Sequence, residues 1–136
     1  DEKLKFLDDK NELRRKNANL YFNLLKDQKN IILPKYDKFC CPVWHLFVIK
    51  LQNEEIRNTL QNYLKNNGIE TGIHYPNPLH KLEAFPELLQ QNSELKNVSD
   101  VATRILSLPM YPELEELEIE YVCNKINEYF FDLLFL

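Results

Sequence analysis

The stretch Val43-Trp44-His45-Leu46-Phe47-Val48-Ile49 has the most strand-like composition in the chain. Its residues are β-branched, aromatic or aliphatic at both alternating positions, so we expect both faces of this strand to be covered. His45 falls inside the stretch, and we expect it to be a core imidazole hydrogen-bonded to a neighbour. The stretch therefore predicts a buried strand around which the rest of the chain packs.

The segments after this strand alternate between helix and strand patterns. Asn53 is a good N-cap, and Ile56, Leu60 and Leu64 follow at helical spacing until Gly68 ends the helix. A second strand is predicted at 69–74 and a third at 105–108, with short helices at 86–91 and 97–104 between them. A charged helix over residues 1–27 precedes all of these elements.

The last predicted helix covers residues 114–130. Its spacing directs five apolar side chains toward the core, namely Leu117, Tyr121, Val122, Ile126 and Tyr129. The apolar tail 130–136 must pack against this chain or a partner. The order of elements predicts an α+β fold, in which a small, mainly antiparallel sheet packs with helices on one face.

Composition excludes several classes of protein. The 136 residues carry 17 Lys and Arg against 21 Asp and Glu, and this net charge of −4 argues against a nucleic-acid partner. Only two glycines are present, too few for a glycine-rich phosphate loop. No apolar run approaches the ~18 residues of a membrane span. Three cysteines, two of them adjacent, make a poor disulfide framework and indicate a reducing, cytoplasmic setting.

The candidate functional residues are His74, Tyr75 and His80, which lie at both ends of a loop containing two prolines. An imidazole and a phenol held at a strand end are suited to contacting a polar ligand. The alternative is a rigid loop whose polar side chains cap local backbone groups. A metal site is not expected, because the spacing of the possible ligands forms neither a CxxC nor an HExxH motif. These possible ligands are Cys40, Cys41, His45, His74, His80 and Cys123.

Five blocks, in order, resemble the C-terminal part of the DegT-type sugar aminotransferases, pyridoxal-phosphate (PLP) enzymes that aminate nucleotide-linked keto sugars. The two most specific blocks are GIETGIHYPNPLH at 68–80 and ILSLPMYP at 105–112. The other three blocks cover 14–21, 43–49 and 57–64. The resemblance extends over nearly the whole chain, and the apolar tail departs from it.

The resemblance implies that residues 1–136 form a single C-terminal small domain, with the helix at 1–27 leading in from a large PLP-binding domain. In this family the Schiff-base lysine and the phosphate-binding residues lie in that large domain. No catalytic or cofactor-binding residue is therefore expected in this chain, which alone should be inactive and hold no PLP. Arg57 lies on a helix face and is expected to form a structural ion pair rather than clamp a carboxylate.

The intact enzyme, by the same resemblance, would be a homodimer that moves an amino group from glutamate to the keto sugar. His74, Tyr75 and His80 would then lie at the edge of the sugar. The alternative is a non-catalytic binding or scaffold module that offers its apolar tail and first helix as an interface. A small metal-binding protein is a third, weaker hypothesis.

Overall fold

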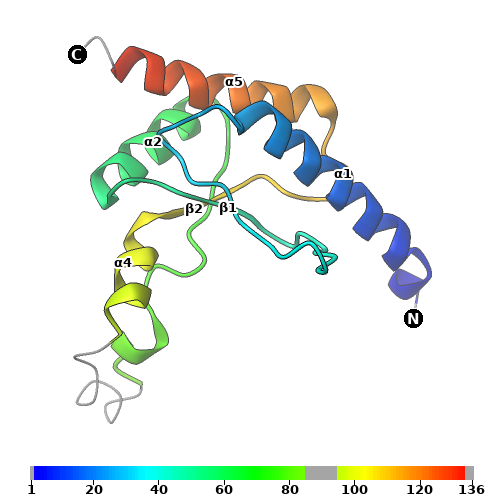
Figure 1. Ribbon diagram of the computed structural model, residues 1–136, viewed down its shortest axis with the longest axis horizontal. Coiled ribbons are helices and arrows are strands. Elements are labelled where there is room, and N and C mark those ends of the chain that lie inside the picture. Colours follow the sequence, from blue (N-terminus) through cyan, green and yellow to red (C-terminus); the bar gives the residue numbers. More distant parts are fainter. Residues whose placement is uncertain (1, 85–94, 134–136) are drawn as a thin grey trace.

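The computed structural model describes residues 2–84 and 95–133 (Figure 1). This part of the chain holds four α-helices and a two-stranded antiparallel sheet, which confirms the predicted α+β class. The elements, in order, are the 3-10 helix η1 (Glu2–Phe6), α1 (Leu7–Leu25), β1 (Phe47–Lys50), α2 (Glu54–Asn66), the 3-10 helix η2 (Leu79–Lys81), α4 (Lys96–Arg104), β2 (Ile105–Leu108) and α5 (Glu116–Asp132). The predicted helix at 86–91 and residues 134–136 of the apolar tail lie outside the described residues.

Two single-residue bridges widen the sheet beyond β1 and β2. Ile32 pairs with Lys50 on the outer edge of β1, and Gly72 pairs with Ser107 on the outer edge of β2. The Gly72 bridge has both backbone bonds, 3.1 Å from its N–H to the Ser107 carbonyl and 2.7 Å in the reverse direction. The predicted strand at 69–74 is thus reduced to this bridge, because the Ile69 N–H bonds back to the Leu64 carbonyl in the turn after α2.

The first strand also begins later than its composition predicts. Trp44 has a φ of 50°, a left-handed conformation that an extended strand cannot contain, so regular pairing starts only at Phe47. His45 lies before the strand and is exposed. The prediction of a core imidazole at His45 is therefore wrong.

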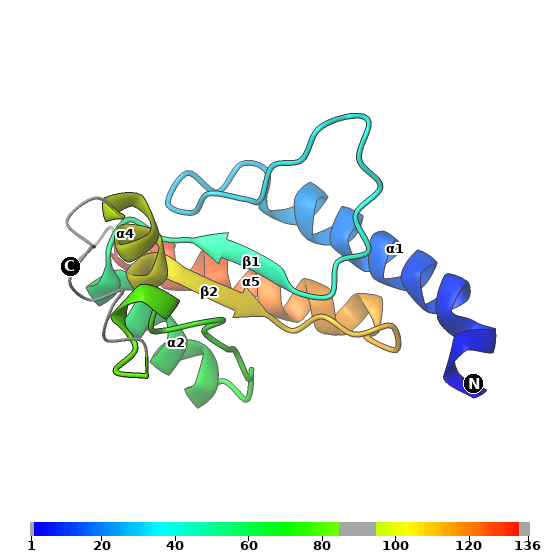
Figure 2. The same cartoon turned by 90° about the horizontal axis from the view of Figure 1, so that it is seen from below.

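One face of the sheet forms the hydrophobic core. Phe47 and Ile49 pair with Leu108 and Leu106, and all four side chains are buried. The Phe47 ring stacks on Tyr21 of α1, with centroids 4.8 Å apart. Helices α1, α2 and α5 supply the rest of the core, and α5 runs behind the two strands in Figure 2.

Polar contacts from α1 fix the segment that leads into α5. The Asn17 amide is buried and donates to the carbonyls of Tyr111, at 3.0 Å, and Leu114, at 3.4 Å. The Tyr21 hydroxyl donates to the Pro109 carbonyl at 2.9 Å. These bonds satisfy the backbone of a proline-rich segment that cannot pair regularly.

The core face of α5 differs in part from the predicted one. Val122, Ile126 and Tyr129 are buried, as predicted, but Leu117 is 73% exposed and Tyr121 is 45% exposed. Leu117 and Tyr121 lie four residues apart on one face of the helix, and this face is opposite the buried stripe of Ile119, Cys123, Ile126 and Phe130. At the other end of the helix, Phe130 is buried while Phe131 and Leu133 are exposed.

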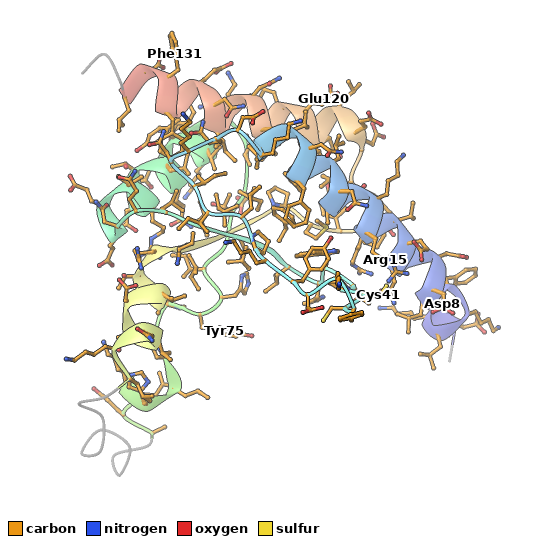
Figure 3. All side chains as sticks on the ribbon, in the orientation of Figure 1. Asp8, Arg15, Cys41, Tyr75, Glu120 and Phe131 are labelled. Carbon is orange, nitrogen blue, oxygen red and sulfur yellow. The ribbon has the colours of Figure 1, made fainter. Side chains whose placement is uncertain are left out.

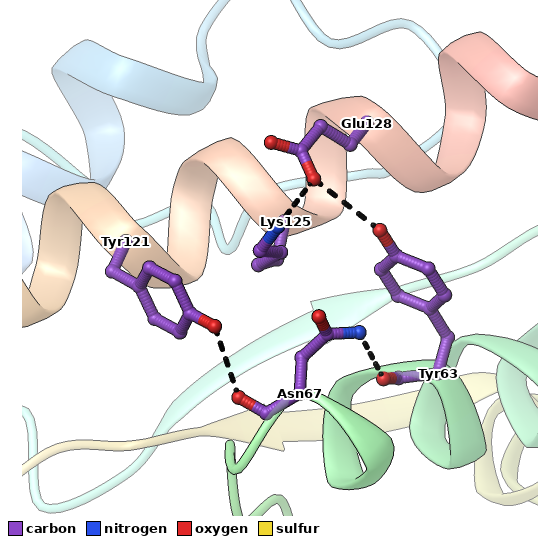
Figure 4. Close-up of polar contacts among 5 residues, drawn as sticks. All are labelled: Tyr63, Asn67, Tyr121, Lys125 and Glu128. Carbon is purple, nitrogen blue, oxygen red and sulfur yellow. Dashed lines mark hydrogen bonds and ion pairs between the residues drawn. The ribbon is translucent and has the colours of Figure 1, made fainter.

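A polar network joins α5 to α2 on the surface (Figure 4). Glu128 accepts from Lys125 at 2.6 Å and from the Tyr63 hydroxyl at 3.4 Å, while the Tyr121 hydroxyl donates to the Asn67 carbonyl at 3.1 Å. The Lys125 ammonium lowers the pKa of Glu128 and its own pKa rises in return. The network is exposed, so it orients the two helices more than it stabilises them.

Removing the N-cap of α2 tests whether the Asn53 side chain stabilises the start of this helix. The Asn53 side chain accepts from the Ile56 N–H at 2.9 Å, satisfying one of the helix's unpaired donors. Asn53→Ala is expected to lower the free energy of unfolding by about 1 kcal/mol in urea titrations. Asn62→Ala, on the exposed middle of the same helix, is the matched control and should be neutral or slightly stabilising. Equal losses from the two variants would contradict the capping role.

Candidate functional site

A pocket of about 750 Å³ lies between α4 and the loop that follows the Gly72 bridge. Within the described residues, the side chains that line it are mostly apolar, with one imidazole, one phenol and two amides. They are His74, Tyr75, Pro76, Asn77, Pro78, Leu79, Leu82, Asn97, Val98, Val101, Ala102 and Ile105. Two prolines in the loop restrict its backbone and so hold its polar side chains at defined positions.

His74 is fixed against the sheet by β2. Its Nδ1 atom lies 3.0 Å from the Ser107 hydroxyl oxygen. The ring covers Gly72 so closely that a Cβ atom there would lie 2.6 Å from the His74 Cε1 atom. The glycine that bridges to the sheet thus also makes room for the imidazole.

Tyr75 stands beside His74 at the mouth of the pocket. The two rings meet edge to face, with centroids 5.8 Å apart and planes at 78°. The Tyr75 side chain is 75% exposed and projects from the loop in Figure 3. His74 and Tyr75 are therefore brought together at a surface that a ligand can reach.

His80 occupies a different environment from the other two predicted residues. It lies in η2, its side chain is buried, and its Nε2 atom is 3.2 Å from the Ser99 hydroxyl oxygen of α4. It ties the far end of the loop to α4, behind the pocket surface. Ser99 and Ser107, which hold the two histidines, were not singled out by the sequence, although Ser107 is visible as a polar residue in an otherwise apolar strand.

The pocket lining is electrostatically neutral among the described residues, since it contains no carboxylate, ammonium or guanidinium group. An imidazole, a phenol and two amides above an apolar floor can hydrogen-bond a neutral, polyhydroxylated ring. They offer no fixed positive charge to hold a phosphate or a carboxylate.

Arg57 is buried on α2, away from this lining. Its Nη2 atom makes a 3.3 Å ion pair with the exposed Glu54, which agrees with the predicted structural pairing. Its Nε and Nη1 atoms have no hydrogen-bond partner among the described residues. Among the described residues, the charge of the Arg57 guanidinium is therefore balanced by one partly solvated carboxylate, that of Glu54.

Among the residues that the structure describes, no lysine lies in the setting that a covalent PLP site requires. A lysine that bonds PLP needs a desolvated amine with a lowered pKa. Within residues 2–84 and 95–133 every lysine is exposed or half-buried, and the pKa of the half-buried Lys125 is raised. Nor do the described residues contain a group of three or more side chains placed to hold a metal ion. In the same part of the chain, no helix combines the length and apolar character needed to cross a membrane.

Several solved structures share this fold, among them a DegT DnrJ EryC1 StrS aminotransferase from Brucella abortus, which is 28% identical, with a TM-score of 0.76 over 94% of this chain and 33% of its own. DesV from S. venezuelae, solved with a ketimine intermediate, is 32% identical and superposes with a TM-score of 0.85 over 93% of this chain and 33% of its own. The ntda protein from Bacillus subtilis, solved with bound cofactor PMP, is 26% identical, with a TM-score of 0.65 over 85% of this chain. The architecture is thus that of one part of an aminotransferase.

Sequence relatives agree with this class. A dTDP-3-amino-3,6-dideoxy-alpha-D-galactopyranose transaminase from Aneurinibacillus thermoaerophilus is 35% identical over 93% of this chain. A UDP-2-acetamido-2-deoxy-3-oxo-D-glucuronate aminotransferase from Pseudomonas aeruginosa is 31% identical over 92% of it. Residues 1–127 match the DegT/DnrJ/EryC1/StrS aminotransferase family, and the chain belongs to that family. It spans about a third of the length of these curated relatives.

Proposed function

We propose that the chain is the C-terminal part of a PLP-dependent aminotransferase that moves an amino group from glutamate to a nucleotide-linked keto sugar. The observation that carries this proposal is the match of more than nine-tenths of the chain to dTDP- and UDP-sugar transaminases at 31–35% identity. Because the chain spans only 33% of those proteins, the remaining two thirds are expected to hold PLP and the catalytic lysine.

In this proposal residues 1–136 act as one small domain, and α1 connects it to the large PLP-binding domain. The span of the chain, about a third of the length of its curated relatives, supports this division between two parts of one enzyme. The chain alone is then inactive. The whole enzyme works as a homodimer in the cytoplasm, a compartment that suits the exposed, unpaired thiols of Cys40 and Cys41.

The loop with His74, Tyr75 and His80 is proposed to lie at the edge of the sugar. The neutral, partly apolar pocket beside it supports this assignment, since sugar hydroxyls need donors and acceptors rather than charges. His74 and Tyr75 would contact the sugar directly. His80, which is buried and joined to Ser99, would act by holding the loop.

Substitutions in the loop test this assignment in the full-length enzyme. His74→Ala and Tyr75→Phe are expected to lower kcat/KM of the sugar half-reaction by about tenfold, because each removes a hydrogen bond to the second substrate. The glutamate half-reaction should change much less. Single-turnover measurements of the two half-reactions separate these effects, and His45→Ala, an exposed histidine outside the pocket lining, is the control. Equal losses in both half-reactions would instead show a purely structural loop.

A non-catalytic scaffold is the second candidate. It is favoured by exposed apolar side chains at the start of the chain, where Leu4 is 67%, Phe6 55% and Leu7 45% exposed. Such a surface fits an interface with a partner as well as with a large domain. Amino transfer to a keto-sugar nucleotide by the full-length polypeptide would reject the scaffold hypothesis.

A further inference from the structure

Ser107 is a buried hydroxyl in a strand that is otherwise apolar. Its neighbours Leu106 and Leu108 pair with the core residues of β1, so strand alternation places the Ser107 side chain on the opposite face of the sheet. The residue is only 4% exposed. A hydroxyl in such a position needs a hydrogen-bond partner, because leaving it unpaired costs free energy.

The described structure gives this hydroxyl one side-chain partner, the His74 Nδ1 atom at 3.0 Å. The backbone N–H and carbonyl of Ser107 are both taken by Gly72. Nδ1 can therefore accept the Ser107 hydroxyl proton, and no other side chain among the described residues is bonded to this hydroxyl. If the hydroxyl donates to Nδ1, the neutral imidazole carries its own proton on Nε2.

Gly72 lies directly against the same ring. A Cβ atom at this position would meet the His74 Cε1 atom at 2.6 Å and the Nδ1 atom at 3.3 Å. The backbone of Gly72 does not have a left-handed φ, so an alanine could adopt its conformation. Any side chain at residue 72 would therefore act on the His74 ring and not through backbone strain.

We propose that Ser107 is a positioning residue for His74: its hydroxyl, with the space left by Gly72, fixes the ring in the Nε2–H tautomer and directs that N–H as a donor toward an oxygen of the sugar. The Nε2 atom has no hydrogen-bond partner within the described residues, and the ring lines the pocket. The choice of the sugar as acceptor rests on the proposed function. The tautomer itself does not.

The tautomer is measured on the 136-residue chain from the ring nitrogen shifts of the ¹⁵N-labelled protein, with His74 assigned by its loss in His74→Ala. We expect His74 to be the Nε2–H tautomer and the exposed His45 to show the mixture of a free imidazole. Ser107→Ala and Gly72→Ala should both move His74 toward that mixture, while Ser107→Thr keeps the hydroxyl and the single tautomer. A mixture or an Nδ1–H tautomer in the unmodified chain, or no change in Gly72→Ala, would overturn the proposal.

Activity of the full-length enzyme then tests the role. Ser107→Ala should lower kcat/KM of the sugar half-reaction about 2- to 12-fold, the range for one oriented hydrogen bond. The double variant His74→Ala/Ser107→Ala should be no worse than His74→Ala, because Ser107 acts through the ring. Additive losses would contradict positioning. If the tautomer is fixed but His74→Ala leaves the sugar half-reaction unchanged, the assignment of the sugar as acceptor is rejected. The interaction between Ser107 and His74 is then still supported.

Discussion

Phe47→Ala is expected to lower the free energy of unfolding by about 3–5 kcal/mol, the range for replacing a buried phenylalanine by alanine. The Phe47 side chain is fully buried, stacks on Tyr21 and meets Phe22 edge to face at 5.2 Å. Its removal leaves a cavity between β1 and α1 that these rings cannot fill without leaving their rotamers. Because domains of this size have about 5–15 kcal/mol of stability, the loss is a large fraction of the total.

Phe39→Ala is the matched control for this prediction. The Phe39 ring is 86% exposed, so its removal should change the stability by less than about 0.5 kcal/mol. Urea titrations of the two variants give the comparison, and Phe47→Leu provides a milder version if the alanine variant does not fold. Similar midpoints for Phe39→Ala and Phe47→Ala would mean that the core does not centre on β1.

The three cysteines should react with iodoacetamide at two very different rates. Cys40 and Cys41 are exposed, whereas Cys123 is 1% exposed on the core face of α5. Burial raises the pKa of the Cys123 thiol from 9.0 to about 12, which by itself lowers the thiolate population about a thousandfold near pH 8. Mass spectrometry of the native chain should therefore show two rapid additions and a third that is slower by at least about three orders of magnitude.

Denaturant and substitution provide the controls for the cysteine prediction. All three thiols should react rapidly in concentrated urea, and Cys123→Val should remove only the slow addition. The raised pKa also has a consequence for stability: between pH 9 and about 12 the unfolded thiol loses its proton while the native one keeps it, so the free energy of unfolding falls as the pH rises. Equal iodoacetamide reaction rates of the three thiols in the native chain would show that α5 does not bury Cys123 in the core.

The fold class could be predicted from sequence because the periodic apolar patterns of the helices and the aromatic and β-branched run at 47–49 are local signals. What could not be predicted depends on single backbone angles. Tryptophan does not favour a positive φ, so the left-handed conformation of Trp44 could not be predicted from the sequence. This conformation shortens β1 and leaves His45 exposed. The exposure of Leu117 could not be predicted either, because it lies on the face of α5 opposite the buried stripe of Ile119, Cys123 and Ile126, and an exposed leucine has the same local pattern as a buried one.

For the candidate site, the sequence singled out the histidines and the tyrosine but not the residues that contact them. His74 and Tyr75 stand out in the sequence because titratable side chains on a proline-rich loop are few. Their partners do not stand out, since Ser107 lies 33 residues after His74 and Ser99 lies 19 residues after His80. These pairs form only when the sheet and α4 are in place, and one sequence contains no local pattern for such contacts.

The packing of α1 against α5 determines when this domain can fold during its synthesis. Asn17 and Tyr21 are bonded to the segment that leads into α5, and Gln28 to Asn127 within it, contacts that span 88 to 99 residues of chain. Helix α5 is the last described element that the ribosome makes. Until it emerges, the core that α1, β1 and α2 share lacks the apolar face of α5, so this part of the chain is expected to complete its core late and to expose apolar surface until then.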